Sequence, residues 1–265
     1  MSKKKMMRVS LVISTYNWPD ALRLCLKSVT RQKRMPDEVI IADDGSTETT
    51  GQVVDSFRGR LDIQHVWHED KGFRKTVIMN KAFALCTGDY IIQTDGDIIL
   101  DRHFIADHLA VARRGYYYDG SRGKLNRTVT EKALRTGSFV PHFWTGGLTR
   151  RLNTLRLPLL TPFFYGYRKH KPERGCNLAF WRDDLYAVNG YDERMIGYGS
   201  EDRDLPERLR RLGVRKRFVK FMAVEYHLYH EEHPTKRDHS ANHAILLENR
   251  EKGIIRVEYG IVKNG

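Results

Sequence analysis

Two patterns of apolar and polar positions alternate along the first half of the chain. Short runs of apolar, often β-branched residues are typical of strands buried on both faces of a sheet. The longer stretches between them repeat apolar side chains at helical spacing. The strands are expected at 9–14, 38–43, 63–68 and 89–97. This β-α-β-α order predicts an α/β fold with three layers, α/β/α, and a mostly parallel central sheet.

Residues that favour helix N-termini mark where the first of these helices is expected to begin. Asn17 is a good N-cap residue, and Pro19 suits the first turn of the helix that follows it. Leu22, Leu26 and Val29 then recur at helical spacing. Further helices are expected at 75–86 and, in the polar and basic tail that begins at residue 235, at about 238–250.

Polar residues follow three of the expected strands at the point where each strand ends. These segments read STYN, ADDGS and TDGD. Because open parallel sheets bind ligands beyond the carboxyl ends of their strands, these side chains are expected to gather at one edge of the sheet. None of the three turns carries the glycine pattern of a dinucleotide fold or of a P-loop.

The TDGD segment places two carboxylates, Asp95 and Asp97, on either side of a glycine. At a turn, both can converge on a divalent cation as hard oxygen ligands. The alternative is an ordinary Asp-Gly turn without a ligand, which is common.

The ADDGS segment has a similar pair of interpretations. Asp44 either closes an Asx turn or accepts hydrogen bonds from a ribose hydroxyl or a pyrimidine N–H. Thr15 and Tyr16 at the neighbouring strand end are placed to hold a base. Arg74 and Lys75 stand at the start of the expected helix 75–86, where a diphosphate can bind, or they are simply solvated.

The segment GYGSEDRDLPERL, 197–209, carries a further acidic pair. Pro206 disfavours a helix that continues through the segment, so a helix is expected to start near Asp204, with Asp204 and Glu207 as a capping box. Glu201 and Asp202 then fall in a glycine-containing loop. One can serve as a general base while the other orients a hydroxyl group. The simpler interpretation is that acidic residues merely mark the start of a helix.

The segment EYHLYHEEH contains histidines spaced by three, at 227, 230 and 233. Alone, this spacing does not establish a metal site. Together with the carboxylates of TDGD, one imidazole completing a metal sphere becomes a reasonable hypothesis.

Charge adds the expectation of an anionic partner. The chain of 265 residues has a formal net charge of +13, which suits nucleic acid, a phosphate-bearing substrate or an anionic membrane surface. No nucleic-acid-binding motif is present, so nucleic acid is not expected as a partner. The three cysteines, Cys25, Cys86 and Cys176, lack metal-ligand spacing and predict buried thiols in a reducing, cytoplasmic compartment. No apolar run approaches the length of a membrane-spanning helix.

The segment 120–175 is expected to be irregular, because it lacks periodicity. Between Phe143 and Lys171 it contains no acidic residue. It is either a solvated excursion or a segment that contacts an anionic lipid headgroup or an acidic acceptor. Contact with lipid would place the chain peripherally at the inner face of a membrane. Its basic residues are Arg150, Arg151, Arg156, Arg168, Lys169 and Lys171, interleaved with Trp144, Leu152, Leu155, Phe163, Phe164 and Tyr165.

The order of these motifs resembles the family 2 glycosyltransferases with a GT-A fold. The segments are VSLVISTYN, EVIIADDGS, GFRKTVIMNKAF, GDYIIQTDGD, GCNLAFWRDDLYAVNGYDE, GYGSEDRDL and YHLYH. The second half is similar to galactosyltransferase and N-acetylgalactosaminyltransferase members, including chondroitin-polymerase-type domains. The resemblance covers about 8–234 and implies a single domain at 1–234, followed by a basic C-terminal tail at 235–265. Within the domain, a nucleotide-sugar half is expected at 8–119, the irregular basic and aromatic segment at 120–175 and an acceptor half at 176–234. The segment 120–175 and Pro206 depart from the family pattern.

The resemblance implies a metal-dependent, inverting enzyme of polysaccharide or cell-envelope synthesis. Its donor would be a UDP-sugar, its cofactor Mn²⁺ or Mg²⁺, and its acceptor a glycan or a lipid-linked sugar. Asp202 would be the catalytic base and Glu201 would bind the acceptor. The implied ligand contacts are Thr15, Tyr16 and Asp44 for the uridine, Arg74 for the diphosphate, Asp95 for the ribose or the metal, Asp97 as main metal ligand, and His227, or failing that His230, as a further ligand.

Two other functions remain open at this point. A nucleotidyltransferase that forms sugar nucleotides also uses an α/β sheet and a metal, but STYN is a poor cradle for a nucleoside triphosphate. A non-catalytic binding module could keep the fold, but it would not need Asp97 and Asp202 together.

Overall fold

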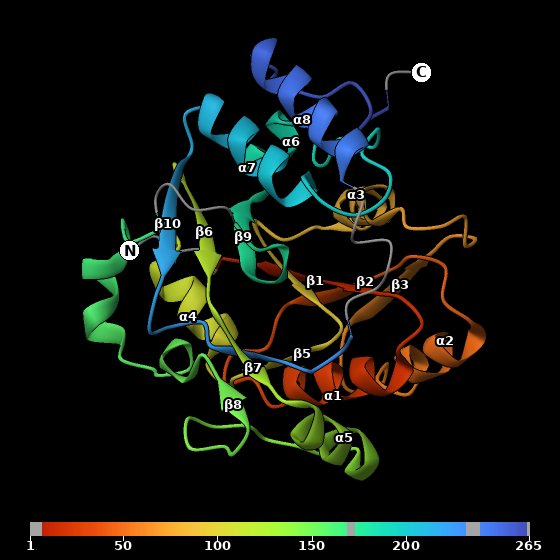
Figure 1. Cartoon of the computed structure of the whole chain (residues 1–265), viewed down its shortest axis with the longest axis vertical. Coiled ribbons are helices and arrows are strands. Elements are labelled where there is room, and N and C mark those ends of the chain that lie inside the picture. The colour runs from red at the N-terminus through yellow and green to blue at the C-terminus, as the bar shows by residue number, and fades with distance from the viewer. Residues whose placement is uncertain (1–6, 169–172, 232–238, 264–265) are drawn as a thin grey trace, which may run out of the picture.

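A computed structural model describes residues 7–168, 173–231 and 239–263, and it confirms the predicted three-layer α/β/α fold (Figure 1). In these residues, seven strands form the central sheet in the order β10-β6-β9-β4-β1-β2-β3. The strands are β1 (Val9–Thr15), β2 (Glu38–Asp43), β3 (Ile63–Trp67), β4 (Tyr90–Asp95), β6 (Tyr116–Gly120), β9 (Leu178–Trp181) and β10 (Arg215–Val219).

The sheet is mostly parallel, as expected. β4, β1, β2 and β3 lie side by side and parallel, whereas β9 runs antiparallel between β4 and β6. Every residue of β2 is buried, which explains the uninterrupted apolar run in its sequence. The four strands predicted from the sequence are all present, and the fourth ends at Asp95, where the Gly96 turn begins.

Helices cover both faces of this sheet. α1 (Pro19–Val29), α2 (Glu48–Asp55) and α4 (Phe104–Val111) pack on one face, and α3 (Lys75–Leu85), α6 (Arg182–Ala187) and α7 (Glu201–Arg211) pack on the other (Figure 1). Leu22 of α1 and Leu205 of α7 are both fully buried. Each such leucine contributes about 1.5–3 kcal/mol to stability by leaving water.

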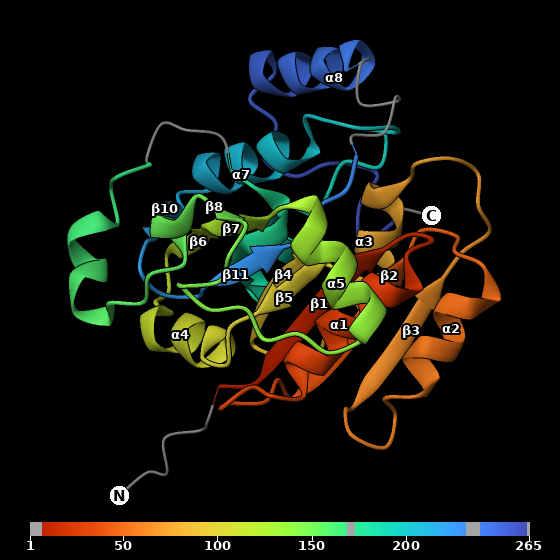
Figure 2. The same ribbon diagram turned by 60° about the horizontal axis from the view of Figure 1, so that its bottom comes forward.

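A second, smaller sheet extends the carboxyl edge of the first. Its strand order is β5-β11-β7-β8, and it packs against α1 and α5 (Arg127–Thr136), which lie next to each other (Figure 2). The strands are β5 (Ile98–Leu100), β7 (Arg122–Leu125), β8 (Leu148–Thr149) and β11 (Glu225–His227). β5 follows the Asp95-Gly96-Asp97 turn directly and pairs with β11, so His227 lies opposite Ile98.

The expected N-cap of the first helix is wrong. α1 begins at Pro19 without a side-chain cap. Asn17 instead adopts a left-handed backbone conformation, with φ 45°, and its Oδ1 accepts a 2.9 Å hydrogen bond from the Thr47 backbone N–H. Its side chain therefore ties together the loops that follow β1 and β2.

The segment 120–175 is more regular than expected. It contains β7, β8 and α5, and Asn126 caps α5 by accepting a 3.0 Å hydrogen bond from the Val129 N–H. The pattern was obscured because α5 buries few residues, among them Thr130 and Ala133. The later part of the segment has short 3-10 turns, η1 (Arg151–Asn153), η2 (Pro158–Phe164) and η3 (Gly175–Asn177).

The C-terminal helix packs against the rest of the fold. The helix expected at about 238–250 is α8 (Ser240–Glu251), which packs outside α7 (Figure 1). Asn249 of α8 donates hydrogen bonds to Asp192 and to Asp204 of α7, at 3.0 and 2.9 Å. The segment 235–265, expected as a basic tail, therefore includes a helix that hydrogen-bonds to buried polar groups of α7 and of the loop before it.

Three further sequence predictions concern cysteines, membrane spans and residues outside the described ranges. Cys25, Cys86 and Cys176 are buried free thiols, as predicted. No helix in the described ranges is long and apolar enough to cross a membrane. Lys169, Lys171 and His233 lie outside the described residues.

Candidate active site

The carboxyl ends of β1, β2 and β4 open into a cleft formed by two adjoining cavities. The larger cavity has a volume of about 830 Å³ and the smaller one about 210 Å³. Both are lined by Phe73, Lys75, Asp95, Asp97 and Tyr198, so they form one continuous site. The position of the cleft is the one expected for an open parallel sheet.

The smaller cavity brings together the residues predicted to hold a nucleotide. Thr15, Tyr16, Asp44 and Asp95 all line it. The Asp44 carboxylate is fixed on both sides, because Oδ1 lies 2.7 Å from Nε2 of His68 and Oδ2 accepts a 2.9 Å hydrogen bond from the backbone N–H of residue 74. Burial raises the pKa of Asp44, while the hydrogen bond from His68 opposes this shift. Asp44 is thus a rigid acceptor at the far end of the cavity.

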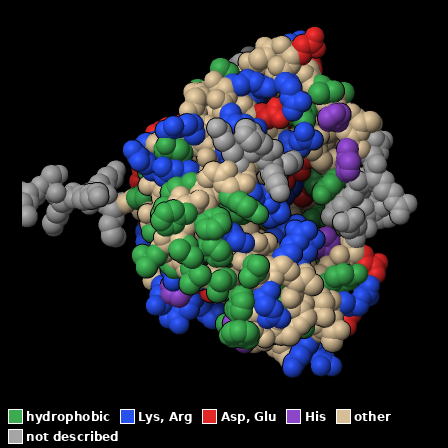
Figure 3. Space-filling view, turned by 60° about the vertical axis from the view of Figure 1, so that its left-hand side comes forward, with side chains coloured by type: hydrophobic (Ala, Val, Ile, Leu, Met, Phe, Trp, Pro, Cys, Tyr) green, Lys and Arg blue, Asp and Glu red, His purple; other side chains and the backbone are tan. Residues whose placement is uncertain are grey.

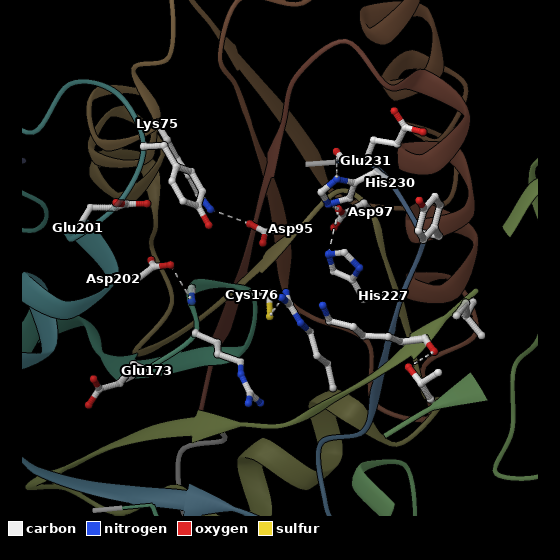
Figure 4. Close-up of a pocket in the computed structure, with 18 of the residues that line it drawn as sticks. Lys75, Asp95, Asp97, Glu173, Cys176, Glu201, Asp202, His227, His230 and Glu231 are labelled. Carbon is white, nitrogen blue, oxygen red and sulfur yellow. Dashed lines mark hydrogen bonds and ion pairs between the residues drawn. The ribbon is translucent and has the colours of Figure 1, made fainter. Parts of the chain in front are cut away.

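The structure does not bring Arg74 into the cleft. Its guanidinium donates a 2.5 Å hydrogen bond to the Glu69 carbonyl, and Arg74 lines neither cavity. The adjacent Lys75, in the first turn of α3, points into the cleft instead and donates a 2.8 Å hydrogen bond to Oδ1 of Asp95 (Figure 4). Successive side chains at a helix start point in different directions, which is why the neighbour of the predicted residue occupies the site.

Asp95 is held as a carboxylate. Burial would raise its pKa, but Lys75 and a 2.7 Å hydrogen bond from the Ser14 hydroxyl outweigh it, and the pKa falls to about 2. Asp95 is therefore ionised throughout the neutral pH range.

Asp97, His227 and His230 form a cluster that can bind a metal ion. One ligand atom from each lies within 4.8 Å of the others. Oδ2 of Asp97 is 3.3 Å from Nε2 of His227 and 3.4 Å from Nε2 of His230 (Figure 4). The pairing of β11 with β5 creates this cluster, since it places His227 beside the residue that follows Asp97. The predicted ligand His227 and its alternative His230 thus lie at the same site.

The protonation states of this cluster suit a divalent cation. Burial, and then Asp95, raise the pKa of Asp97 to about 6. Burial, and then Arg122, lower the pKa of His227 to about 3, so its imidazole is neutral and able to ligate. Oδ1 of Asp97 is buried and has no hydrogen-bond partner among the described residues. A carboxylate with an unused oxygen and two imidazoles fit Mn²⁺, and Asp95 adds the hard oxygen that Mg²⁺ also accepts.

The expected start of the helix at Asp204 is wrong. α7 begins at Glu201, after Ser200 in a left-handed conformation with φ 71°, and Pro206 lies inside it. The acidic residues of its first turn are favoured by the helix dipole. Pro206 removes one backbone hydrogen bond, but tertiary packing of the helix overrides this cost.

Asp204 has a structural role in place of the predicted cap. Its Oδ2 accepts a 2.7 Å hydrogen bond from Nε of Arg208, and both side chains are almost completely buried. The other guanidinium nitrogens of Arg208 donate to the carbonyls of Val188 and Gly190. This network joins α7 to the loop that follows α6.

Glu201 and Asp202 face the cleft although they belong to the first turn of α7 (Figure 4). Oδ2 of Asp202 accepts a 3.0 Å hydrogen bond from the backbone N–H of Gly175, and the Tyr191 hydroxyl lies 3.5 Å from Oδ1. A Cβ atom on residue 175 would collide with this carboxylate, so glycine is required there. Glu201 and Asp202 thus lie both at a helix start and on the wall of the cleft, so the two interpretations of the acidic pair do not exclude each other.

Both acidic side chains have raised pKa values. Burial raises the pKa of Asp202, whereas Lys75 opposes the shift. Burial, and then Asp202, raise the pKa of Glu201 to about 7, and its Oε2 has no hydrogen-bond partner among the described residues. A buried carboxylate whose pKa lies closer to neutrality is a stronger base than an exposed one, which is the property a general base needs.

Cationic residues that the sequence did not single out also line the larger cavity. They are Arg122, Lys124 and Arg174. Arg174 stands directly before the GCN motif, so its position carried a signal. Arg122 and Lys124 reach the cleft because β7 pairs with β11, and no local pattern predicts that pairing.

Comparisons with protein families match most of the chain. The model described as "Glycosyl transferase family 2" matches 10–171, and "N-terminal domain of galactosyltransferase" matches 161–231. The validoxylamine A glucosyltransferase of Streptomyces hygroscopicus subsp. limoneus is 30% identical over 264 residues, which cover 91% of this chain and 55% of that protein. The chondroitin synthase of Escherichia coli is 27% identical over 257 residues, which cover 87% of this chain and 35% of that protein. The chain thus spans about half or less of these relatives.

Solved structures share the fold. S. aureus TarS, residues 1–349 in complex with UDP, has a TM-score of 0.59 at 18% identity and covers 84% of this chain and 61% of its own. The mannosyltransferase PcManGT from Pyrobaculum calidifontis, in complex with GDP-Man and Mn²⁺, has a TM-score of 0.57 at 20% identity. The match covers 84% of this chain and 57% of PcManGT.

Proposed function

The chain belongs to glycosyl transferase family 2, and on that premise we propose that it transfers a hexose such as galactose or N-acetylgalactosamine from a UDP-sugar to a hydroxyl group of a glycan or lipid-linked acceptor. The proposal includes inversion at the anomeric carbon and dependence on a divalent cation. One observation supports it: the smaller cavity, the carboxylate–imidazole cluster and the Asp202 carboxylate lie in a single cleft.

The smaller cavity would hold the uridine. Asp44 would accept a hydrogen bond from the base, and Thr15 and Tyr16 would complete its walls. TarS, a structure of the same fold, is in complex with UDP, which supports a uridine donor. Lys75 lies where the two cavities meet and would compensate negative charge on the diphosphate, the role predicted for Arg74.

Asp97, His227 and His230 would hold the cation, with Asp95 as a further oxygen ligand. When bound, Mn²⁺ or Mg²⁺ would stabilise the negative charge that develops on the departing diphosphate. PcManGT is in complex with GDP-Man and Mn²⁺, which supports a metal in this fold. The neutral His227 and the unused Oδ1 of Asp97 are the properties of this chain that favour the assignment.

Asp202 would act as the general base in a single displacement. It would take the proton of the acceptor hydroxyl while that oxygen forms a bond to the anomeric carbon. On the opposite face, the bond from this carbon to the diphosphate oxygen would break, so the configuration inverts. Glu201, next to it in the larger cavity, would bind the acceptor. The backbone N–H of Gly175 keeps the Asp202 carboxylate oriented.

The acceptor proposal includes contact with an anionic membrane surface. Trp144, Leu159 and Phe163 expose 79%, 89% and 83% of their surface. Figure 3 shows hydrophobic side chains gathered on one face of the molecule with lysine and arginine side chains around them. An exposed apolar patch with a basic surround is typical of a surface that lies on anionic lipid.

A donor screen tests the proposed function. The protein is incubated with UDP-glucose, UDP-galactose and their N-acetylamino forms, each with Mn²⁺ or with a chelator, and UDP release is measured. We expect metal-dependent UDP release from one donor. Release of pyrophosphate from UTP and a sugar phosphate would favour the nucleotidyltransferase alternative. No turnover of any donor would contradict the proposal.

A further inference from the structure

Among the described residues, a third cavity, separate from the nucleotide side of the cleft, is lined by four cationic side chains and no acidic one. Its volume is about 240 Å³. It lies between η1, the end of β10 and the residues on either side of the gap at 169–172. The lining residues are Arg150, Asn153, Tyr167, Arg168, Arg174, Phe218 and Lys220.

This cationic cavity adjoins the acceptor side of the active cleft. Arg174 lines both the cationic cavity and the larger cavity of the cleft. The next residue, Gly175, donates the hydrogen bond that orients Asp202. A molecule bound with one end in the cationic cavity can therefore extend past Arg174 toward the proposed base.

The positive charge of the cavity is only partly compensated within the described residues. Arg168 lies 3.7 Å from the Asp119 carboxylate, which Lys216 also approaches to 3.1 Å. Lys220 donates a 2.7 Å hydrogen bond to Asn153, a neutral partner. Nη1 of Arg174 is buried and has no hydrogen-bond partner among the described residues. Asp119 attracts the Arg174 guanidinium but leaves this buried nitrogen without a hydrogen-bond acceptor in the described part of the chain, so the cavity favours a negatively charged ligand.

The cationic side chains of the cavity repel one another, and this repulsion contributes to lowered pKa values of two of them. Burial, and then Arg168, lower the pKa of Arg174. Burial, and then Arg174, lower the pKa of Lys220. An anion placed between them would relieve this repulsion.

We propose that the cationic cavity binds a phosphate group carried by the acceptor. This inference rests on the proposed function and extends it by naming the chemistry of the acceptor. Guanidinium groups present paired N–H donors that match phosphate oxygens. A phosphomonoester carries about −1.5 to −2 charges and three acceptor oxygens at neutral pH, which suits four cations better than the single charge of a carboxylate.

The phosphate has two possible sources with the same chemistry. One is a soluble phosphorylated sugar, and the other is a lipid-linked phosphate at a membrane surface. Tyr167, which lines the cavity, is 66% exposed and packs against Phe164, the neighbour of the exposed Phe163. The test must therefore contain both a soluble probe and a lipid probe.

The soluble probe is glycerol 1-phosphate, titrated calorimetrically into the full chain, with glycerol as the neutral control. The double variant Arg150→Ser/Lys220→Met removes two cavity cations that lie outside the proposed catalytic cleft. The matched control is Lys132→Met/Arg135→Ser, which removes two exposed cations from α5. We expect the cavity variant to bind glycerol 1-phosphate at least about tenfold more weakly and the control to bind it like wild type.

The lipid probe is sedimentation with phosphatidylcholine vesicles that do or do not contain phosphatidic acid. If the cavity variant loses affinity only for phosphatidic acid vesicles, the phosphate belongs to a lipid. If it loses affinity for glycerol 1-phosphate, a soluble phosphate is sufficient. Equal binding of both probes by wild type and the cavity variant would overturn the inference.

Donor hydrolysis separates this inference from the proposed function. UDP release without acceptor should be the same in wild type and in Arg150→Ser/Lys220→Met. If wild type turns over no UDP-sugar while phosphate binding still depends on Arg150 and Lys220, the proposed function fails and the phosphate site stands. If wild type turns over a donor but phosphate binding does not depend on these residues, the phosphate site fails alone.

Discussion

The carboxylate of Asp202 accepts a 3.0 Å hydrogen bond from the backbone N–H of Gly175. The two residues belong to different elements, since Gly175 opens the turn before β9 and Asp202 lies in the first turn of α7. The contact is so close that residue 175 has no room for a side chain. A backbone donor of this kind fixes the orientation of one carboxylate oxygen and leaves the other toward the cleft.

This contact makes Asp202→Asn a clean test of the proposed base. The amide oxygen of asparagine can accept the same hydrogen bond from Gly175, so the fold and UDP affinity should be retained. The amide cannot take a proton, and sugar transfer should fall by about 10²- to 10⁴-fold. Asp183→Asn, at a side chain that is 75% exposed in the neighbouring helix α6, is the matched control and should transfer normally. Transfer by Asp202→Asn at the wild-type rate would show that another group is the base.

The buried pair of Asp204 and Arg208 predicts a large loss of stability. Asp204→Asn would leave the Arg208 guanidinium, which has no exposed surface, without its counter-charge. The free energy of unfolding should fall by about 3–5 kcal/mol, measured by urea denaturation. Asp55→Asn breaks an exposed pair with Arg58 and should cost less than about 1 kcal/mol. Equal small losses in both variants would mean that the Arg208 charge is compensated by its two carbonyl partners.

The sequence was sufficient to predict four adjacent strands of the central sheet, β4, β1, β2 and β3, and one edge of the site. The strands ending at Thr15, Asp43 and Asp95 are continuous apolar runs because both faces are covered by helices, and such runs are visible locally. Since the strands are parallel, their carboxyl ends had to meet, and the polar residues beyond them had to gather.

The rest depended on contacts between distant segments. The rule that proline ends a helix is local, and burial of Leu205 together with the Asp204–Arg208 pair overrides it in α7. Arg122 reaches the cleft only through the pairing of β7 with β11, and such pairing has no signature in a single sequence. The contact of His227 with Asp97 likewise needs the register of β11 on β5.

The carboxylate–imidazole cluster predicts metal-dependent nucleotide binding. In wild type, calorimetric titration should give tighter binding of UDP with Mn²⁺ than with a chelator. Asp97→Asn and His227→Gln should each reduce this Mn²⁺-dependent gain by at least about tenfold, because each removes one ligand of the cluster. His243→Gln, at an exposed position of α8, is the control. Identical UDP affinities with and without Mn²⁺ in wild type would exclude a metal role in donor binding.

The exposed apolar face predicts binding to anionic vesicles. Leu159→Ser/Phe163→Ser should reduce flotation with phosphatidylglycerol vesicles, since each side chain exposes more than four-fifths of its surface. Thermal stability should not fall, because neither side chain is part of the core. Leu247→Ser, at a partly exposed position of α8, is the control and should float like wild type. Unchanged flotation of the double variant would leave this face without a membrane role.

The raised pKa of Glu201 predicts that the free energy of unfolding depends on pH. Its pKa is raised to about 7 from an ordinary value of 4.5, by burial first and by Asp202 second. The folded state therefore binds this proton more tightly than the unfolded state does. Below pH 4.5 the carboxyl group is protonated in both states and costs nothing. Between pH 4.5 and 7 the wild type loses stability as pH rises, and above pH 7 the full cost, on the order of 3 kcal/mol, is present.

Glu201→Gln removes the titrating group but keeps its shape, so it should stabilise the folded protein at pH 8 and have little effect at pH 4.5. The difference between the two pH values, measured as the change in free energy of unfolding, should be about 1–3 kcal/mol. Glu48→Gln, at an exposed position, is the matched control and should change the free energy of unfolding little at either pH. If Glu201→Gln is instead destabilising at pH 8, the carboxylate has a favourable partner in the folded state and the raised pKa is wrong. A further outcome is that Glu201→Gln both stabilises the protein and lowers sugar transfer to the acceptor. That outcome would mean that Glu201 costs stability but is kept for its function in the cleft. Residues with strongly shifted pKa values are common at functional sites, where function is gained at a cost in stability.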